Sequence, residues 1–116
     1  MPIEHIKLSQ KAKDALSRLK RDTGIQHWNV LCRWAFCTSL KESSTPPLMN
    51  HPADSNVEMT WKVFAGEYGE LYWALLKQRL KTDKIELTEE HLHNQFRLHL
   101  YPGISYLSAS QMTSLA

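Results

Sequence analysis

The chain has 116 residues, 42% of them apolar, and a formal net charge of +2 at pH 7. This length fits one small domain with a modest core, and no apolar run approaches the roughly 20 residues that span a bilayer. The N-terminus also lacks the apolar region of a signal peptide, so we expect a cytoplasmic protein that does not enter a membrane.

The charges are unevenly distributed along the chain. Residues 1–41 contain eight Lys or Arg and three acidic residues, a net charge of +5, whereas the remainder contains six against nine, a net charge of −3. A basic end can bind a polyanion, and an acidic end can keep the protein in solution or bind a basic partner. The alternative is that these cations form an ordinary solvated surface.

Residues 3–8 alternate like a short β-strand, with Ile6 and Leu8 on one face and His5 and Lys7 on the other. So short a strand needs a partner, and we expect it to pair with its equivalent in a second subunit. In such a ribbon, His5 and Lys7 are the side chains placed to contact base edges.

A basic helix is expected next. Ser9 suits its N-cap, Gly24 suits its end, and an apolar stripe at the spacing of one helix face begins at Ala12.

The cations of this helix occupy several of its faces. Lys13 and Lys20 lie on one flank of the stripe, Lys11 and Arg18 lie on the other, and Arg21 lies nearly opposite it. Several copies of this segment in an oligomer would form an extended positive surface that matches a row of phosphates.

A second helix, over about residues 26–41, has almost no polar face. A helix that is apolar all round must be buried on most sides, so we expect an oligomer in which other subunits cover it. Arg33 is the exception: it reaches solvent, pairs with an acid or lines an interface. The first amide groups of this helix can also hold a phosphate.

Cys32 and Cys37 are five residues apart on this second helix. The axial rise of about 7.5 Å exceeds the reach of an intrachain disulfide, so we expect two buried, reduced thiols.

The second half of the chain has a less regular hydrophobic pattern. Residues 42–56 contain three prolines and form a mobile loop or a docking surface, and residues 57–66 fit either a strand or a helix. A helix is expected over residues 67–81. Another opens at Thr88, has its apolar edge at positions 92, 96 and 100, and ends at Pro102-Gly103. Residues 1–108 then form one helical domain and residues 109–116 a flexible tail.

No motif in the chain points to catalysis. His91, His93 and His99 do not converge as helical metal ligands at i, i+4 would, so we expect surface or interface histidines, no metal site and no cofactor. Nucleotide-binding glycine motifs and nucleophile motifs are also absent from the sequence, and we expect a protein that is not an enzyme.

Several short sequence segments together resemble one family. They are Gly24-Ile25, residues 29–37 with Ser39-Leu40, residues 66–68, residues 75–79, and His99-Leu100 followed by residues 103–107. Over about residues 3–108 the chain resembles the DndE family of the bacterial DNA phosphorothioation system.

The resemblance implies a part in replacing a non-bridging phosphate oxygen of DNA by sulfur, with sulfur delivery carried out by other members of the system. It also implies a homotetramer that binds duplex DNA, preferentially nicked, through surface lysines. We place that surface at Lys7, Lys11, Lys13 and Lys20, together with Arg18 and Arg21.

Two hypotheses follow for a mainly α-helical protein with a ribbon-helix-helix-like start. One is a non-catalytic DNA-binding accessory subunit, and the other is a ribbon-helix-helix-type transcriptional repressor that reads an operator. A repressor favours its operator by about a thousandfold or more over random DNA, whereas an accessory subunit does not.

Overall fold

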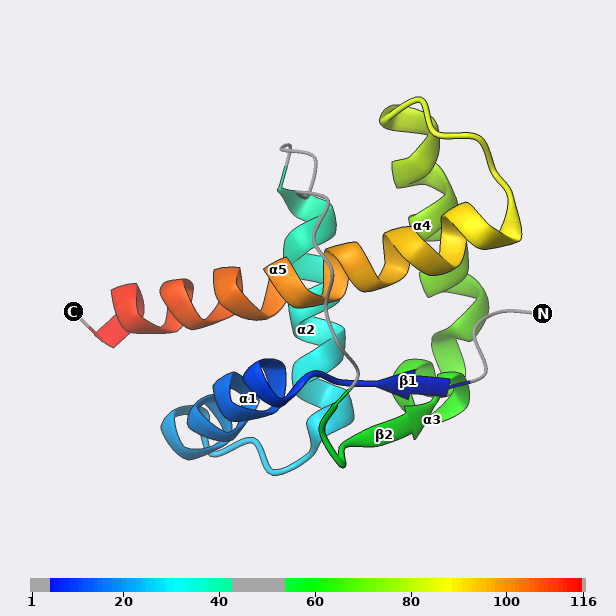
Figure 1. Cartoon of the computed structure of the whole chain (residues 1–116). Coiled ribbons are helices and arrows are strands. Elements are labelled where there is room, and N and C mark those ends of the chain that lie inside the picture. The colour runs from blue at the N-terminus through cyan, green and yellow to red at the C-terminus, as the bar shows by residue number, and fades with distance from the viewer. Residues whose placement is uncertain (1–4, 43–53, 116) are drawn as a thin grey trace.

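The computed structural model describes residues 5–42 and 54–115 of the chain, with side chains to residue 107. Most of the loop expected over residues 42–56 therefore lies outside the described residues. The described part is mainly α-helical, as predicted, and its helices surround one core (Figure 1). In chain order the elements are β1 (His5–Lys7), α1 (Gln10–Thr23), α2 (Trp28–Lys41), β2 (Glu58–Thr60), α3 (Trp61–Ala65), the 3-10 helix η1 (Gly66–Tyr68), α4 (Gly69–Thr82) and α5 (Glu89–Leu115).

The N-terminal strand finds its partner within the same chain. β1 pairs antiparallel with β2, and Ile6 lies opposite Met59, both side chains being buried. The expectation that this strand pairs with a second subunit is therefore wrong. It fails because residues 57–66 are neither all strand nor all helix: they form β2, after which Thr60 accepts a hydrogen bond from the Val63 amide at 3.1 Å and starts α3.

Helix α1 has the predicted ends and the predicted buried face. The Ser9 hydroxyl accepts a hydrogen bond from the Ala12 amide at 3.1 Å, and Gly24 ends the helix in the left-handed conformation at φ 78°. Ala12, Leu16 and Leu19 are buried. The apolar stripe thus fixes which side of α1 meets the core, and the basic residues are left on its other sides.

Helix α2 is buried on one side only within the chain. Cys32 and Phe36 are fully buried, whereas Trp34 is 58% exposed and Cys37 is also exposed. The expectation of two buried thiols is confirmed for Cys32, where burial raises the pKa to about 12. It is wrong for Cys37, because that residue follows Trp34 by one turn on the exposed side of the helix.

Arg33 has a role that the sequence did not reveal. Its guanidinium donates hydrogen bonds to the backbone carbonyls of Phe64 and, at 3.2 Å, Val63. These carbonyls belong to the end of α3, where the short helix leaves acceptors without intrahelical partners. Arg33 therefore joins α2 to α3.

An aromatic cluster fills the core. The ring centroid of Phe96 on α5 lies 5.0 Å from that of Phe36 and 5.1 Å from that of Phe64. The ring of Trp61 packs against Phe64 with a centroid separation of 5.4 Å. These tilted and edge-to-face contacts join α2, α3 and α5, and they favour one relative placement of the three helices.

Helix α5 continues through Pro102 to Leu115, so the expected helix end at Pro102-Gly103 is wrong. A proline inside a helix costs about 3 kcal/mol because it removes one amide donor and crowds the preceding turn. Here Gly103 lies directly against the backbone of Ala35, and Ile104 is buried in the core. The packing of α5 across α2 (Figure 1) offsets the local cost.

Arg79 of α4 binds the end of α2. Its Nη1 donates to the carbonyls of Ser39, Leu40 and Glu42, the last at 2.6 Å, and its Nε lies 2.9 Å from the Asp83 carboxylate. Arg79 is only 8% exposed. A buried guanidinium needs such partners, and here they are the last carbonyls of a helix and a carboxylate.

His99 of α5 is fully buried, so the expectation of a surface or interface histidine is wrong for this residue. Its Nδ1 lies 2.8 Å from the Ser39 hydroxyl. Burial, together with the positive charge of Arg79, lowers the pKa of His99 to about 4, although Asp83 acts in the opposite direction. The side chain is neutral at pH 7 and ties α5 to α2.

Candidate nucleic-acid interface

The predicted cations lie on two consecutive elements. Lys7 lies on the exposed side of β1, and the others lie on α1, at one end of the molecule and away from α4 (Figure 1). This set extends over several sides of α1, and we call it the basic face: Lys7, Lys11, Lys13, Arg18, Lys20 and Arg21.

Lys11 and Arg18 lie two turns apart on one flank of α1, and both are exposed. Lys7 is exposed on the neighbouring strand, where alternation buries Ile6 beside it. These three residues can offer their charges to a polyanion without moving the backbone, because long cationic side chains reorient readily at a surface.

Lys13 is half-buried, and its Nζ donates to the Asn56 side-chain oxygen at 2.6 Å. Nearby, the Asp54 carboxylate accepts from the Gln10 amide at 2.7 Å, at the first residue of α1. A carboxylate at the positive end of a helix is favourable. Lys13 therefore also anchors the segment that leads into β2, and the same end of α1 holds a negative charge.

Lys20 lies over an aromatic ring. Its Nζ is 3.7 Å from the centroid of the Trp28 ring, a cation–π contact between α1 and α2. Arg21 is exposed, with its Nε 3.7 Å from the Asp22 carboxylate. Lys20 must give up or share its contact with the Trp28 ring when it binds a phosphate. The ion pair between Arg21 and Asp22 is exposed and therefore weak.

The ribbon carries a negative charge on its outer side. Glu58 lies opposite Lys7 in the β1–β2 register, and its carboxylate is 3.2 Å from Nδ1 of His5. A carboxylate beside both His5 and Lys7 offsets part of the positive charge that this face of the ribbon offers to phosphates. The intrachain pairing also removes the two-subunit ribbon on which the repressor hypothesis depends.

The amide end of α2 is the other expected phosphate contact. Its N-cap residue, His27, makes no side-chain hydrogen bond to the first amides of the helix. Phosphate binding by these amides stays a prediction.

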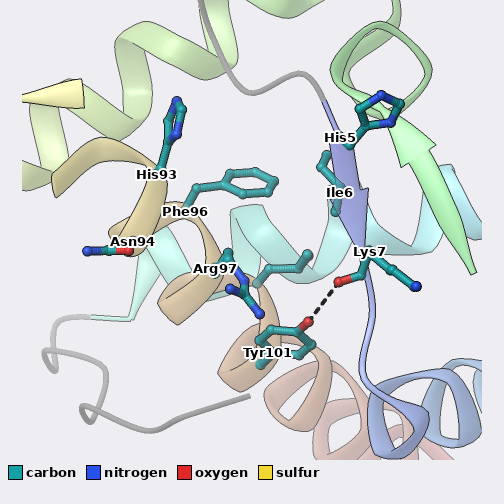
Figure 2. A pocket seen from close by; sticks show the side chains of 9 residues that line it. His5, Ile6, Lys7, His93, Asn94, Phe96, Arg97 and Tyr101 are labelled. Carbon is teal, nitrogen blue, oxygen red and sulfur yellow. Dashed lines mark hydrogen bonds between the residues drawn. The ribbon is translucent and has the colours of Figure 1, made fainter. Parts of the chain in front are cut away.

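A cavity of about 320 Å³ lies between β1 and α5 (Figure 2). Lys7 belongs to its lining, and the Tyr101 hydroxyl donates to the Lys7 carbonyl at 3.2 Å. Arg97 and His93 also line it. The sequence prediction missed this site, although a signal was present: positions 93, 97 and 101 are four residues apart and lie on one face of a helix.

The described residues contain no group of three or more His, Cys, Asp or Glu that could hold a metal ion. His91 uses its Nδ1 in a 2.8 Å contact with the Glu86 carbonyl, and His99 contacts Ser39. The three candidate histidines are thus not gathered at one point. Among the described helices, none is long and apolar enough to cross a membrane.

Comparison with known proteins gives one family. The family described as DNA sulphur modification protein DndE matches residues 5–114. The fold is similar to the crystal structure of DndE from Escherichia coli B7A, involved in DNA phosphorothioation modification, with 25% identity, a TM-score of 0.74, and coverage of 92% of this chain and 98% of that one. It is also similar to a DndE G21/24K mutant, with 19% identity, a TM-score of 0.69, and coverage of 91% and 99%. No curated protein sequence matches the chain.

Proposed function

The chain belongs to the DNA sulphur modification protein DndE family, and from this premise we propose that it is a non-catalytic subunit that binds duplex DNA for phosphorothioation. Family membership indicates the role in DNA phosphorothioation. We further propose that the subunit prefers nicked duplex, that other proteins of the system deliver the sulfur, and that the protein works in the cytoplasm, where that DNA is.

The observation that carries the proposal is the basic face. Lys7, Lys11 and Arg18 are exposed on two adjoining elements, while the apolar side of α1 is buried beneath them. Lysine and arginine bind phosphate oxygens without reading sequence, and release of counterions from DNA supplies most of the affinity of such contacts. This arrangement suits an accessory subunit that must bind many sequences.

Within the basic face, the residues are expected to contribute unequally. Lys11 and Arg18 are fully available, whereas Lys13 is bound to Asn56 and Lys20 is held on the Trp28 ring. Binding through the second pair must first give up these contacts. We therefore expect Lys11 and Arg18 to contribute more to DNA affinity than Lys13 and Lys20.

We also propose that the protein acts as a homo-oligomer, with a tetramer as the expected form. Five large apolar side chains, from α2, α3, η1 and α4, are at least 40% exposed: Trp34, Val63, Tyr68, Leu71 and Leu75. Monomeric proteins rarely leave many such side chains in neighbouring elements uncovered. We call these five residues the apolar patch, and we propose that a second copy covers it.

The test compares intact, nicked and unrelated duplexes at several salt concentrations. A Lys11→Gln, Arg18→Gln double variant is expected to weaken binding to all duplexes alike. It should also lower the slope of log K against log salt by about 1 for each phosphate that the variant no longer neutralises. Fluorescence anisotropy with labelled duplexes measures both quantities.

A Lys81→Gln, Lys84→Gln variant is the matched control, because it removes the same charge from exposed positions at the end of α4 and just beyond it. It should change the salt slope little. Equal slopes for the unmodified protein and the Lys11→Gln, Arg18→Gln variant would place the DNA on another face. A thousandfold preference for one sequence would instead favour the repressor hypothesis.

A further inference from the structure

The cavity between β1 and α5 adjoins the basic face at Lys7, which belongs to both. Its volume of about 320 Å³ is near the lower end of the range for small-ligand pockets. Building on the proposed function, we propose that this cavity receives one unpaired nucleobase of the DNA bound on the basic face.

The inner wall of the cavity is apolar. Ile6 from β1 and Phe96 and Leu100 from α5 are all buried, and Figure 2 shows Ile6 and the Phe96 ring facing each other between the two elements. Both elements are fixed in place, since Phe96 belongs to the aromatic cluster and β1 is bonded to α5 through Tyr101 and Lys7. The cavity is therefore held open by the fold.

The rim of the cavity carries a flat cationic group. The Arg97 side chain lies between α5 and β1 (Figure 2), and none of the described lining residues is acidic. Guanidinium planes stack on bases, and their N–H groups donate hydrogen bonds to base edges. An apolar floor beside such a group suits a nucleobase, which has apolar faces and a polar edge.

Only an unpaired base can use this cavity. A paired base is stacked inside the duplex, and its faces are covered by its neighbours. A base at a bulge, a frayed end or an interrupted strand has lost part of that stacking and can turn toward the protein at lower cost. The cavity would then add affinity for irregular DNA to the general affinity of the basic face.

The experiment uses the full-length protein and three otherwise identical duplexes: fully paired, with a single-nucleotide bulge carrying adenine, and with an abasic bulge. The two bulged duplexes have the same backbone and charge, so their affinity ratio isolates the base. We expect the adenine bulge to bind at least about fivefold more tightly than the abasic bulge, the effect of stacking one base.

Two variants locate the base. Arg97→Ala removes the guanidinium at the rim, and Ile6→Phe fills the cavity; each should bring the adenine-to-abasic ratio close to 1 while leaving the affinity for paired duplex within about twofold. Lys81→Ala, which removes a positive charge on α4, should keep the full ratio. Circular dichroism and thermal unfolding show which variants are folded. If Ile6→Phe does not fold, the result for Arg97→Ala alone tests the nucleobase site.

The outcomes separate this proposal from the one on which it rests. Equal affinity for adenine and abasic bulges, with paired duplex still bound, overturns the nucleobase site and leaves the DNA-binding function standing. An unchanged ratio in folded Arg97→Ala also overturns it, since the base then lies elsewhere. Failure to bind any of the three duplexes overturns the proposed function itself.

Discussion

The chemistry of His99 is set by its place in the core. The side chain is fully buried beside Ser39, and its pKa is lowered to about 4 from the ordinary value of about 6.5. Below pH 6.5 the unfolded chain takes up a proton that the folded chain resists, so stability should fall between pH 6.5 and pH 4. We expect a loss of about 2 kcal/mol between pH 7 and pH 5. Urea unfolding at each pH measures it. His99→Gln, which cannot titrate, should show a clearly smaller loss, and identical pH profiles would contradict this.

At the scale of elements, the crossing of α5 over α2 depends on Gly103. A Cβ atom at this position would lie 1.9 Å from the Ala35 carbonyl oxygen, a backbone atom that cannot move aside alone. Gly103→Ala should therefore push the two helices apart and cost about 3 kcal/mol or more, at the upper end of overpacking effects. Chemical denaturation gives the change. Gly24→Ala is a useful comparison, because there the space is open and only the positive φ of 78° opposes the side chain. A Gly103→Ala protein as stable as the unmodified one would show that the helices do not approach this closely.

These elements also show which parts of the fold can be predicted from the sequence. The ends and the buried face of α1 follow from local chemistry, since Ser9, Gly24 and the apolar spacing act within the helix itself. The partner of β1 and the passage of α5 through Pro102 depend on contacts between distant parts of the chain, which periodicity does not contain. The same holds for the candidate site: the cations of α1 are visible as a charge excess, whereas the cavity exists only because β1 lies against α5.

At the scale of the whole molecule, the proposed oligomer depends on the apolar patch. The hydrophobic pattern of the sequence predicts that α2 is buried on most sides, but within one chain Trp34 is 58% exposed. If a second copy covers the patch, a charge at this position should act on assembly and not on the fold of the subunit. An exposed substitution changes the stability of a separate subunit by no more than about 0.5 kcal/mol, whereas a charge buried in an interface costs several.

We therefore expect Trp34→Asp to yield a folded protein of lower oligomeric state, and Lys62→Asp, at an exposed polar position on α3, to retain the oligomer. Sedimentation velocity measures the assembly, and circular dichroism measures the fold. Dissociation should also weaken DNA binding, because a separate subunit presents one basic face where the oligomer presents several, and fewer phosphates are then neutralised at once. A Trp34→Asp protein that keeps its oligomeric state would show that the patch is not the contact between copies. An unmodified protein that sediments as a monomer would remove the oligomer from the proposal altogether.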